Sequence, residues 1–319
     1  MSDFPFKILI SDPLPGIARE ILEESGQVEV IDCPESIDGC LASIDGWIIR
    51  SGSKITEEVL ARAPKLKCIC RAGAGVDNID CDAAAARGVT VMNTPAANSN
   101  AAAEHAIALM FAIARQIPFS HAVMAEGGWD RNKFVGIELA GKCLLVLGLG
   151  KVGKGVARKG VALGMKVLGV DPFIDTDSVR QDGVELVSFA KGLPRADFIS
   201  LHTPLNDETR GLVGDEFLRQ CKAGVRIINV SRGPVIDEEA LFSALESGKV
   251  GGAALDVFES EPPAENSPLR GHPAIVCTPH LGASTVEAQL NVGIASANQV
   301  LEYLRKGVVE NRVNEPRSV

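Results

Sequence analysis

The sequence predicts an α/β protein built from two doubly wound parallel sheets, and three observations lead to that fold class. The chain has 319 residues, which exceeds the usual size of one domain. Short apolar runs alternate with amphipathic segments through both halves, as they do when helices connect parallel strands. Apolar residues make up 46% of the chain and aromatic residues only 4%, which predicts aliphatic cores of the kind that parallel sheets bury.

A first series of strands and helices precedes a long helix. Its strands are expected at 6–11, 28–31, 46–50, 67–71 and 89–92, with amphipathic helices at 16–24 and 56–62. The long helix should run over about 98–115, because Asn98, Ser99 and Asn100 can all cap its first turn. Pro118 is expected to end this helical pattern, since proline breaks a helix interior.

A second series of strands begins at Cys143. Its strands are expected at 143–147, 166–170, 198–201, 225–230, 252–256 and 274–277. The last amphipathic stretch, 284–303, is typical of one long helix. Such a helix would fit a chain that returns to pack on the first domain.

Charge and cysteine usage exclude several classes of protein. The net charge is −9 without a long basic run, so nucleic acid is not an expected partner, and an anionic substrate would need a local cluster of arginine or lysine. The longest apolar run, 106–114, is too short to cross a membrane, and the N-terminus lacks the pattern of a signal peptide. The eight cysteines show neither CxxC pairs nor zinc spacings, which predicts buried reduced thiols, a cytoplasmic location and no metal site.

The glycine-rich stretch after the strand at 143–147 predicts a dinucleotide site. Gly148 would allow the tight turn, Gly150 the approach of a pyrophosphate, and Gly153 the close packing of the next helix on the strand. The N-terminus of that helix would attract phosphates. Asp171 ends the following strand, where an acid bonds the ribose hydroxyls and repels a 2′-phosphate, so NAD is favoured over NADP.

Polar residues follow several strands of the second series, and the carboxyl ends of parallel strands form one edge. Hydride transfer between NAD and a hydroxy acid requires a cation for the carboxylate, a base for the hydroxyl proton and an acid that orients the base. Arg232, His280 and Glu261 supply this set. Glu259 competes with Glu261, but the prolines after Glu261 would stiffen its loop. His202 is expected to lie beneath the cofactor and His105 to be packed or solvated.

A family resemblance extends almost end to end. The stretches that carry it are Arg71-Ala-Gly-Ala-Gly-Val-Asp-Asn78, Val91-Met-Asn-Thr-Pro95, Gly148-Leu-Gly-Lys-Val-Gly153, His202-Thr-Pro204, Asn229-Val-Ser-Arg-Gly233, Ala253-Ala-Leu-Asp-Val-Phe258 and Pro279-His-Leu-Gly-Ala-Ser-Thr285. In combination they resemble the D-isomer-specific 2-hydroxyacid dehydrogenases. Within that family the chain is most similar to the members that oxidise 3-phospho-D-glycerate to 3-phosphohydroxypyruvate, the first step of serine biosynthesis.

The resemblance implies an organisation for the chain. A flavodoxin-like substrate domain of residues 1–97 plus 284–319 would be split around an inserted Rossmann domain for NAD, residues 98–283. Homodimers or homotetramers would form, and dimers would associate through the nucleotide domains. Longer family members carry C-terminal regulatory domains; because the sequence ends at Val319, we expect no feedback control through such a domain.

The resemblance also implies roles for individual residues. Arg232, Glu261 and His280 would be the catalytic residues. The expected contacts to NAD are Gly148, Gly150, Lys151, Val152, Gly153, Asp171, Thr203, Pro204, Val230, Ser231, Arg232, Asp256, His280, Gly282 and Ala283, with Asp256 at the nicotinamide amide. The expected substrate contacts are Arg50, Arg71, Gly75, Asn98 and Arg131, the last reaching the phosphate in a neighbouring subunit. Ala74 departs from the family, which often has threonine there, so a hydroxyl contact to NAD is lost.

Two other functions are compatible with these motifs. A glyoxylate or hydroxypyruvate reductase of the same family would use the same catalytic residues but would not depend on Arg50, Arg71 or Arg131. An NAD-sensing scaffold, like the corepressors that resemble this family, would also keep the catalytic residues. Turnover of a hydroxy acid would indicate an enzyme. Capture of protein partners without turnover of any hydroxy acid would favour the scaffold.

Overall fold

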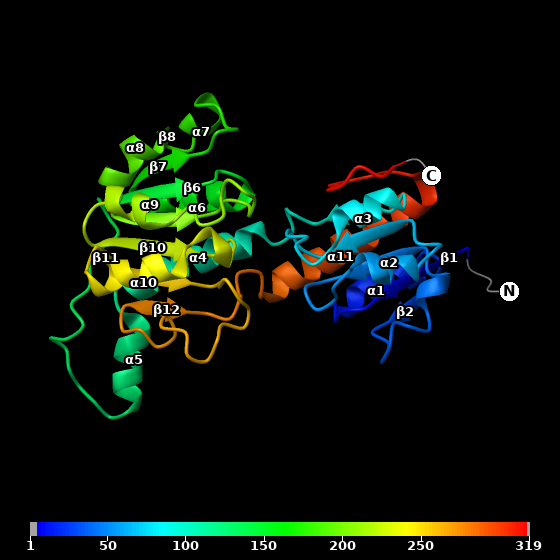
Figure 1. Ribbon diagram of the computed structural model, residues 1–319, viewed down its shortest axis with the longest axis horizontal. Coiled ribbons are helices and arrows are strands. Elements are labelled where there is room, and N and C mark those ends of the chain that lie inside the picture. The colour runs from blue at the N-terminus through cyan, green and yellow to red at the C-terminus, as the bar shows by residue number, and fades with distance from the viewer. Residues whose placement is uncertain (1–4, 318–319) are drawn as a thin grey trace. The chain divides into compact units, whose positions relative to one another are not determined.

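The computed structural model describes residues 5–317, and two compact units divide the chain (Figure 1). One unit contains the described residues up to Asn98 together with those from Ala283 onward, and the other is Ser99–Gly282. The second unit is therefore inserted into the sequence of the first.

The first unit is a parallel sheet with the strand order β2-β1-β3-β4-β5. Its strands are β1 (Phe6–Ile10), β2 (Val28–Asp32), β3 (Gly46–Ile49), β4 (Cys68–Arg71) and β5 (Thr90–Asn93). Its helices are α1 (Gly16–Glu24), α2 (Glu57–Ala61), α3 (Cys81–Ala86) and α11 (Val286–Lys306). This order is the flavodoxin-like one, which confirms the predicted fold class.

Alternating side chains of the strands feed two cores in the first unit. Trp47 and Ile49 of β3 pack on one face with Leu60 of α2, whereas Ile48 packs on the other with Val300 of α11. Helix α11 runs three residues beyond the predicted 303 and ends where Gly307 adopts a left-handed φ of 69°. Gly307 therefore ends the helix as its C-terminal cap, a position that the apolar periodicity of the sequence alone does not predict.

The second unit is a parallel sheet with the order β12-β11-β10-β9-β6-β7-β8. Its strands are β6 (Cys143–Leu147), β7 (Lys166–Val170), β8 (Val184–Leu186), β9 (Phe198–Leu201), β10 (Val225–Asn229), β11 (Val250–Leu255) and β12 (Ile275–Cys277). Its helices are α4 (Ser99–Ala114), α5 (Ile117–Ala125), α6 (Lys151–Ala162), α7 (Asp177–Arg180), α8 (Phe189–Gly192), α9 (Asp215–Gln220) and α10 (Glu238–Glu246). The strand order reverses beside β6, and the carboxyl ends of all these strands lie at one edge, as in a Rossmann domain.

The connection between α4 and α5 differs from the prediction. Pro118 does not simply stop the helical pattern, because it lies in the first turn of α5, where a missing N–H is tolerated. The break between α4 and α5 instead occurs at Gln116, whose φ is 53°. The short strand β8 has no counterpart among the predicted strands.

Helix α4 is a core element of the second unit. Ala103, Ala106 and Met110 are completely buried, and the helix packs beside α6 and against β10, β11 and β12. Within residues 5–317, no single helix is long and apolar enough to cross a membrane; α4 and α5 meet the length and composition criteria only as a pair, bent by 64°.

Candidate active site

The glycine-rich turn joins β6 to the start of α6. Gly148 has a φ of 86°, and a Cβ on it would lie 2.6 Å from the carbonyl oxygen of His202. A Cβ on Gly153 would overlap the carbonyl oxygen of Gly148, so only glycine lets α6 approach the strand. Gly150 has no atom within 4 Å of such a Cβ, which leaves the helix N-terminus open to a ligand.

Asp171 follows β7 and is tied to this turn. One of its carboxylate oxygens accepts the N–H of Leu149 at 2.7 Å, and the other accepts the N–H of Phe173 at 2.9 Å. Each oxygen keeps a further lone pair that a ribose hydroxyl can donate to. Asp171 is thereby held next to the phosphate turn, where the dinucleotide hypothesis requires an acid.

Residues after β9 fit a bound dinucleotide as well. Thr203 Oγ1 is buried and has no hydrogen-bond partner among the described residues, so a ligand donor or acceptor would satisfy it. Burial lowers the pKa of His202 to about 3, and its Nε2 lies 2.8 Å from Ser200 Oγ. A neutral His202 in this place is compatible with the expected structural role beneath the cofactor.

Asn229 orders the turn that carries Arg232. It ends β10, is completely buried, and its amide nitrogen donates to the carbonyl oxygen of Arg232 at 2.9 Å. Its amide oxygen accepts the N–H and the hydroxyl of Ser231 at 3.0 and 2.8 Å. The Arg232 guanidinium, half-buried, donates to the carbonyl oxygen of Ser231 at 2.7 Å.

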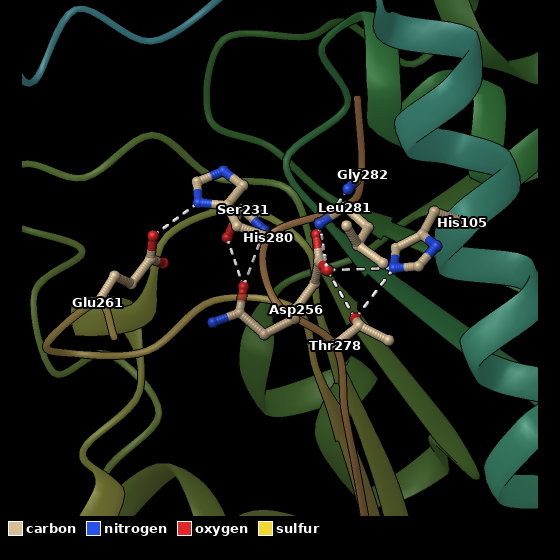
Figure 2. Close-up of polar contacts among 9 residues, drawn as sticks. His105, Ser231, Asp256, Glu261, Thr278, His280, Leu281 and Gly282 are labelled. Atoms are coloured by element: carbon tan, nitrogen blue, oxygen red, sulfur yellow. Dashed lines mark hydrogen bonds and ion pairs between the residues drawn. The ribbon is translucent and has the colours of Figure 1, made fainter. Parts of the chain in front are cut away.

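His280 and Glu261 form a partly exposed pair, with His280 Nδ1 and Glu261 Oε2 2.7 Å apart (Figure 2). The side chains are 50% and 37% exposed. Partial burial acts to raise the pKa of Glu261, but the bonds from His280 and the Phe258 N–H, with the nearby charge of Arg232, lower it overall. Because an ionised carboxylate only accepts, His280 Nδ1 carries a hydrogen and Nε2 remains to exchange a proton with a substrate.

A second, buried group lies beside this pair. Asp256 is 1% exposed, and one carboxylate oxygen accepts the N–H of Leu281 at 2.7 Å and the hydroxyl of Thr278 at 2.6 Å. The other oxygen accepts the N–H of Gly282 at 2.8 Å, and His105 Nε2 lies 3.2 Å from the first (Figure 2). Burial acts to raise the pKa of Asp256, yet these bonds lower it overall, so the carboxylate is ionised at neutral pH.

The predicted substrate residues are distributed over both units. Arg50 directly follows β3 and Arg71 ends β4, and these neighbouring parallel strands place both residues at one edge of the first sheet. Gly75 and Asn98 lie in loops of the same unit, and Arg131 lies exposed between α5 and β6 in the other. Their contacts with substrate stay predictions.

Three residues shape the site although they were not among the predicted site residues. Asn229 ends one strand and Thr278 follows another, so their position at the carboxyl edge of the sheet was the available signal. His105 offered none, because it precedes Asp256 by 151 residues. Within residues 5–317, no group of three or more His, Cys, Asp or Glu side chains could hold a metal ion.

Comparisons with known proteins agree with the predicted type of cofactor. Residues 107–282 match the family model described as the NAD-binding domain of D-isomer specific 2-hydroxyacid dehydrogenases, which confirms NAD as the cofactor type. A D-3-phosphoglycerate dehydrogenase of Methanocaldococcus jannaschii is 47% identical over 97% of this chain and 60% of its own length. The D-3-phosphoglycerate dehydrogenase 2 of Arabidopsis thaliana is 46% identical over 97% of this chain and 50% of its own.

Solved structures show the same fold over their full length. The structure of a glyoxylate reductase from Paecilomyes thermophila has a TM-score of 0.88 and 32% identity, and the alignment covers 97% of this chain and 98% of that one. The chain therefore spans about half to three-fifths of the curated relatives that it matches, and nearly all of this solved relative.

Proposed function

The chain belongs to the D-isomer specific 2-hydroxyacid dehydrogenase family, and from this premise we propose that it oxidises 3-phospho-D-glycerate to 3-phosphohydroxypyruvate with NAD. This reaction is the first step of serine biosynthesis. The observation that carries the proposal is the pair of His280 and Glu261, 2.7 Å apart, in the unit that holds the dinucleotide turn and Arg232. A base, its orienting acid and a cation are what the oxidation of a hydroxy acid requires.

The residues of this chain divide the reaction between them. The guanidinium of Arg232 binds the substrate carboxylate and polarises the oxygen at C2. His280 Nε2 takes the proton of the C2 hydroxyl while the hydride leaves C2, and the ionised Glu261 stabilises the imidazolium that forms. Bound NAD supplies the hydride acceptor. The substrate loses one proton and one hydride, which balances its oxidation to the keto acid.

The arginines of the first unit support a substrate with a second anionic group. Arg50 and Arg71 sit at the ends of adjacent strands, and the chain as a whole is acidic, so this pair of cations is a local exception. A substrate with both a carboxylate and a phosphate needs more cationic side chains to bind it than glyoxylate, which has a single carboxylate. The names of the curated relatives point to the same substrate.

Steady-state kinetics on three substrates tests the proposal. We expect NADH formation from 3-phospho-D-glycerate with a kcat/KM well above that for D-glycerate, and an Arg71→Gln change should narrow the difference between the two acids. Activity on D-glycerate that equals or exceeds that on the phosphorylated acid would refute the substrate assignment. The rate of glyoxylate reduction with NADH is measured as the third substrate comparison.

A glyoxylate or hydroxypyruvate reductase is the second candidate, and the 32% identity to a glyoxylate reductase along nearly its full length favours it. Under this reading Arg50, Arg71 and Arg131 would contribute little. Charge-removing variants at these three positions would then leave the rate on glyoxylate unchanged.

A homodimer or homotetramer is the assembly that we propose. Large apolar side chains of α5 and the loop after it are exposed: Ile117 51%, Met124 51%, Trp129 76% and Val135 77%. Exposed large apolar side chains on one segment are typical of an interface between subunits. Light scattering on the purified protein measures the oligomeric state.

A cytoplasmic location is also proposed, since Cys68 and Cys70 are buried free thiols.

A further inference from the structure

We propose that His105 is a positioning residue for the loop that carries His280, and that it acts through Asp256 and Thr278. The proposal rests on the proposed dehydrogenase function, because it assigns a further residue to that reaction. His105 projects from the core helix α4 toward the residues that follow β11 and β12 (Figure 2). A side chain anchored on a rigid helix is well placed to fix a loop.

The hydrogen-bond roles in this group can be deduced. The Thr278 hydroxyl donates its only hydrogen to Asp256 Oδ1 at 2.6 Å, so its oxygen can only accept a further hydrogen bond. His105 Nε2 lies 3.2 Å from Asp256 Oδ1 and 3.1 Å from Thr278 Oγ1. Since neither oxygen has a hydrogen to offer, His105 Nε2 carries the hydrogen and shares it between the two.

Asp256 transmits this contact to the catalytic loop. Its carboxylate accepts the N–H groups of Leu281 and Gly282, and its carbonyl oxygen accepts the N–H of His280 at 2.9 Å. His280 has a φ of 54°, a backbone conformation that residues other than glycine rarely adopt. The loop therefore depends on these hydrogen bonds. The orientation of Asp256 therefore sets where the His280 ring meets Glu261.

His105 completes an uneven arrangement of donors. Asp256 Oδ1 accepts from His105, Thr278 and Leu281, whereas Oδ2 accepts from Gly282. Removal of the His105 donor leaves the buried Asp256 carboxylate with one fewer hydrogen bond. The carboxylate can then rotate more freely about its side-chain bonds. The backbone bonds to the loop then hold a less fixed acceptor, and His280 becomes less well placed.

The test compares His105→Leu, which removes the donor, with His105→Gln, whose amide N–H can replace it. His272→Leu is the matched control, since His272 Nε2 lies 3.2 Å from Glu246 Oε1 in the same unit but serves another region. Two readouts are measured on the full chain: kcat and the KM for NAD with saturating 3-phospho-D-glycerate, and hydrogen exchange of a peptide containing Leu281 and Gly282. If His105→Leu does not fold, His105→Asn, which is too short to reach, takes its place.

We expect His105→Leu to lower kcat about 10-fold with little change in the KM for NAD, because one hydrogen bond to a charged group is lost. Exchange at Leu281 and Gly282 should accelerate, His105→Gln should restore both properties, and His272→Leu should change neither. Unchanged exchange in His105→Leu overturns the inference, as does faster exchange with an unchanged kcat. Faster exchange in a chain that oxidises no 2-hydroxy acid instead keeps the positioning of the loop and refutes the proposed function.

Discussion

Two histidine–carboxylate pairs lie in the same unit, and their surroundings differ sharply. The side chains of His280 and Glu261 are 50% and 37% exposed, whereas those of His105 and Asp256 are 20% and 1% exposed. Glu261 accepts from His280 and one backbone N–H, but Asp256 accepts four donors. In the proposed roles, the exposed pair offers the second ring nitrogen of His280 to a substrate, and the buried pair holds the loop of residues 280–282 in place.

The comparison shows that a shared pair of residue types does not define a role. Partner count and exposure decide whether a carboxylate assists a proton transfer or anchors a loop. The two pairs meet at His280, whose side chain belongs to the first and whose backbone N–H is bound to Asp256. Variants that affect one pair alone can therefore test whether the two pairs have different roles.

The largest effect is expected at the exposed pair. His280→Ala removes the proposed base and should lower kcat by about 100- to 10,000-fold, the range for the loss of an acid–base group. The affinity for NAD should stay nearly unchanged, because the glycine turn is intact. Stopped-flow NADH formation and a separate NAD titration measure both quantities. A loss of NAD binding would mean that His280 supports the fold of the site.

At the buried pair the expected effect is on stability. Asp256→Ala leaves the N–H groups of Leu281 and Gly282 and the hydroxyl of Thr278 without their acceptor, which should cost about 3 kcal/mol of unfolding free energy. Urea denaturation followed by circular dichroism measures the change. Glu261→Ala is the comparison variant, and a similar loss of stability there would remove the distinction between the pairs.

His202 is a buried histidine that has no carboxylate partner within residues 5–317, and it should make stability depend on pH. Its pKa is about 3 in the folded chain, against about 6.5 for an unperturbed histidine, so the unfolded chain binds more protons between these values. Stability therefore falls as pH decreases from about 6.5 toward 3, by at most about 1.4 kcal/mol per pH unit from this group. Denaturation of wild type and His202→Gln over this window measures the difference, and equal slopes contradict the assignment.

The smallest effect is expected at Asp171, a carboxylate that accepts two backbone N–H groups. Asp171→Gly removes a negative charge from the proposed ribose site and should improve the NADP to NAD ratio of kcat/KM about 10-fold. Kinetics with both cofactors at fixed ionic strength measures the ratio. An unchanged ratio would show that Asp171 only supports the turn through Leu149 and Phe173.

The sequence predicted those parts of the fold and site that follow from local pattern. The strands at 143–147, 166–170 and 198–201 have the bounds of β6, β7 and β9, because each is a short run that is mostly apolar. Motif residues such as Arg232 were predicted as site residues because parallel strands bring their carboxyl ends together. Strand β8 has only three residues with Glu185 at its centre, which leaves no periodic signal.

The remaining features depend on tertiary contacts. Nothing in the helical pattern of α4 marks His105 as the partner of an acid 151 residues later. The start of α5 at Ile117, with Pro118 in its first turn, depends on the left-handed backbone of Gln116, which a proline-based rule does not reveal. Both features arise from packing between distant segments, which outweighs local preference.

Direct transfer of deuterium tests the central claim most plainly. 3-Phospho-D-glycerate labelled with deuterium at C2 is incubated with NAD and the wild-type chain, and the reduced cofactor is analysed by mass spectrometry. The account predicts NADH that carries one deuterium, formed at a rate that His280→Ala reduces at least 100-fold. Unlabelled NADH, or no NADH from a chain that binds NAD, would contradict it.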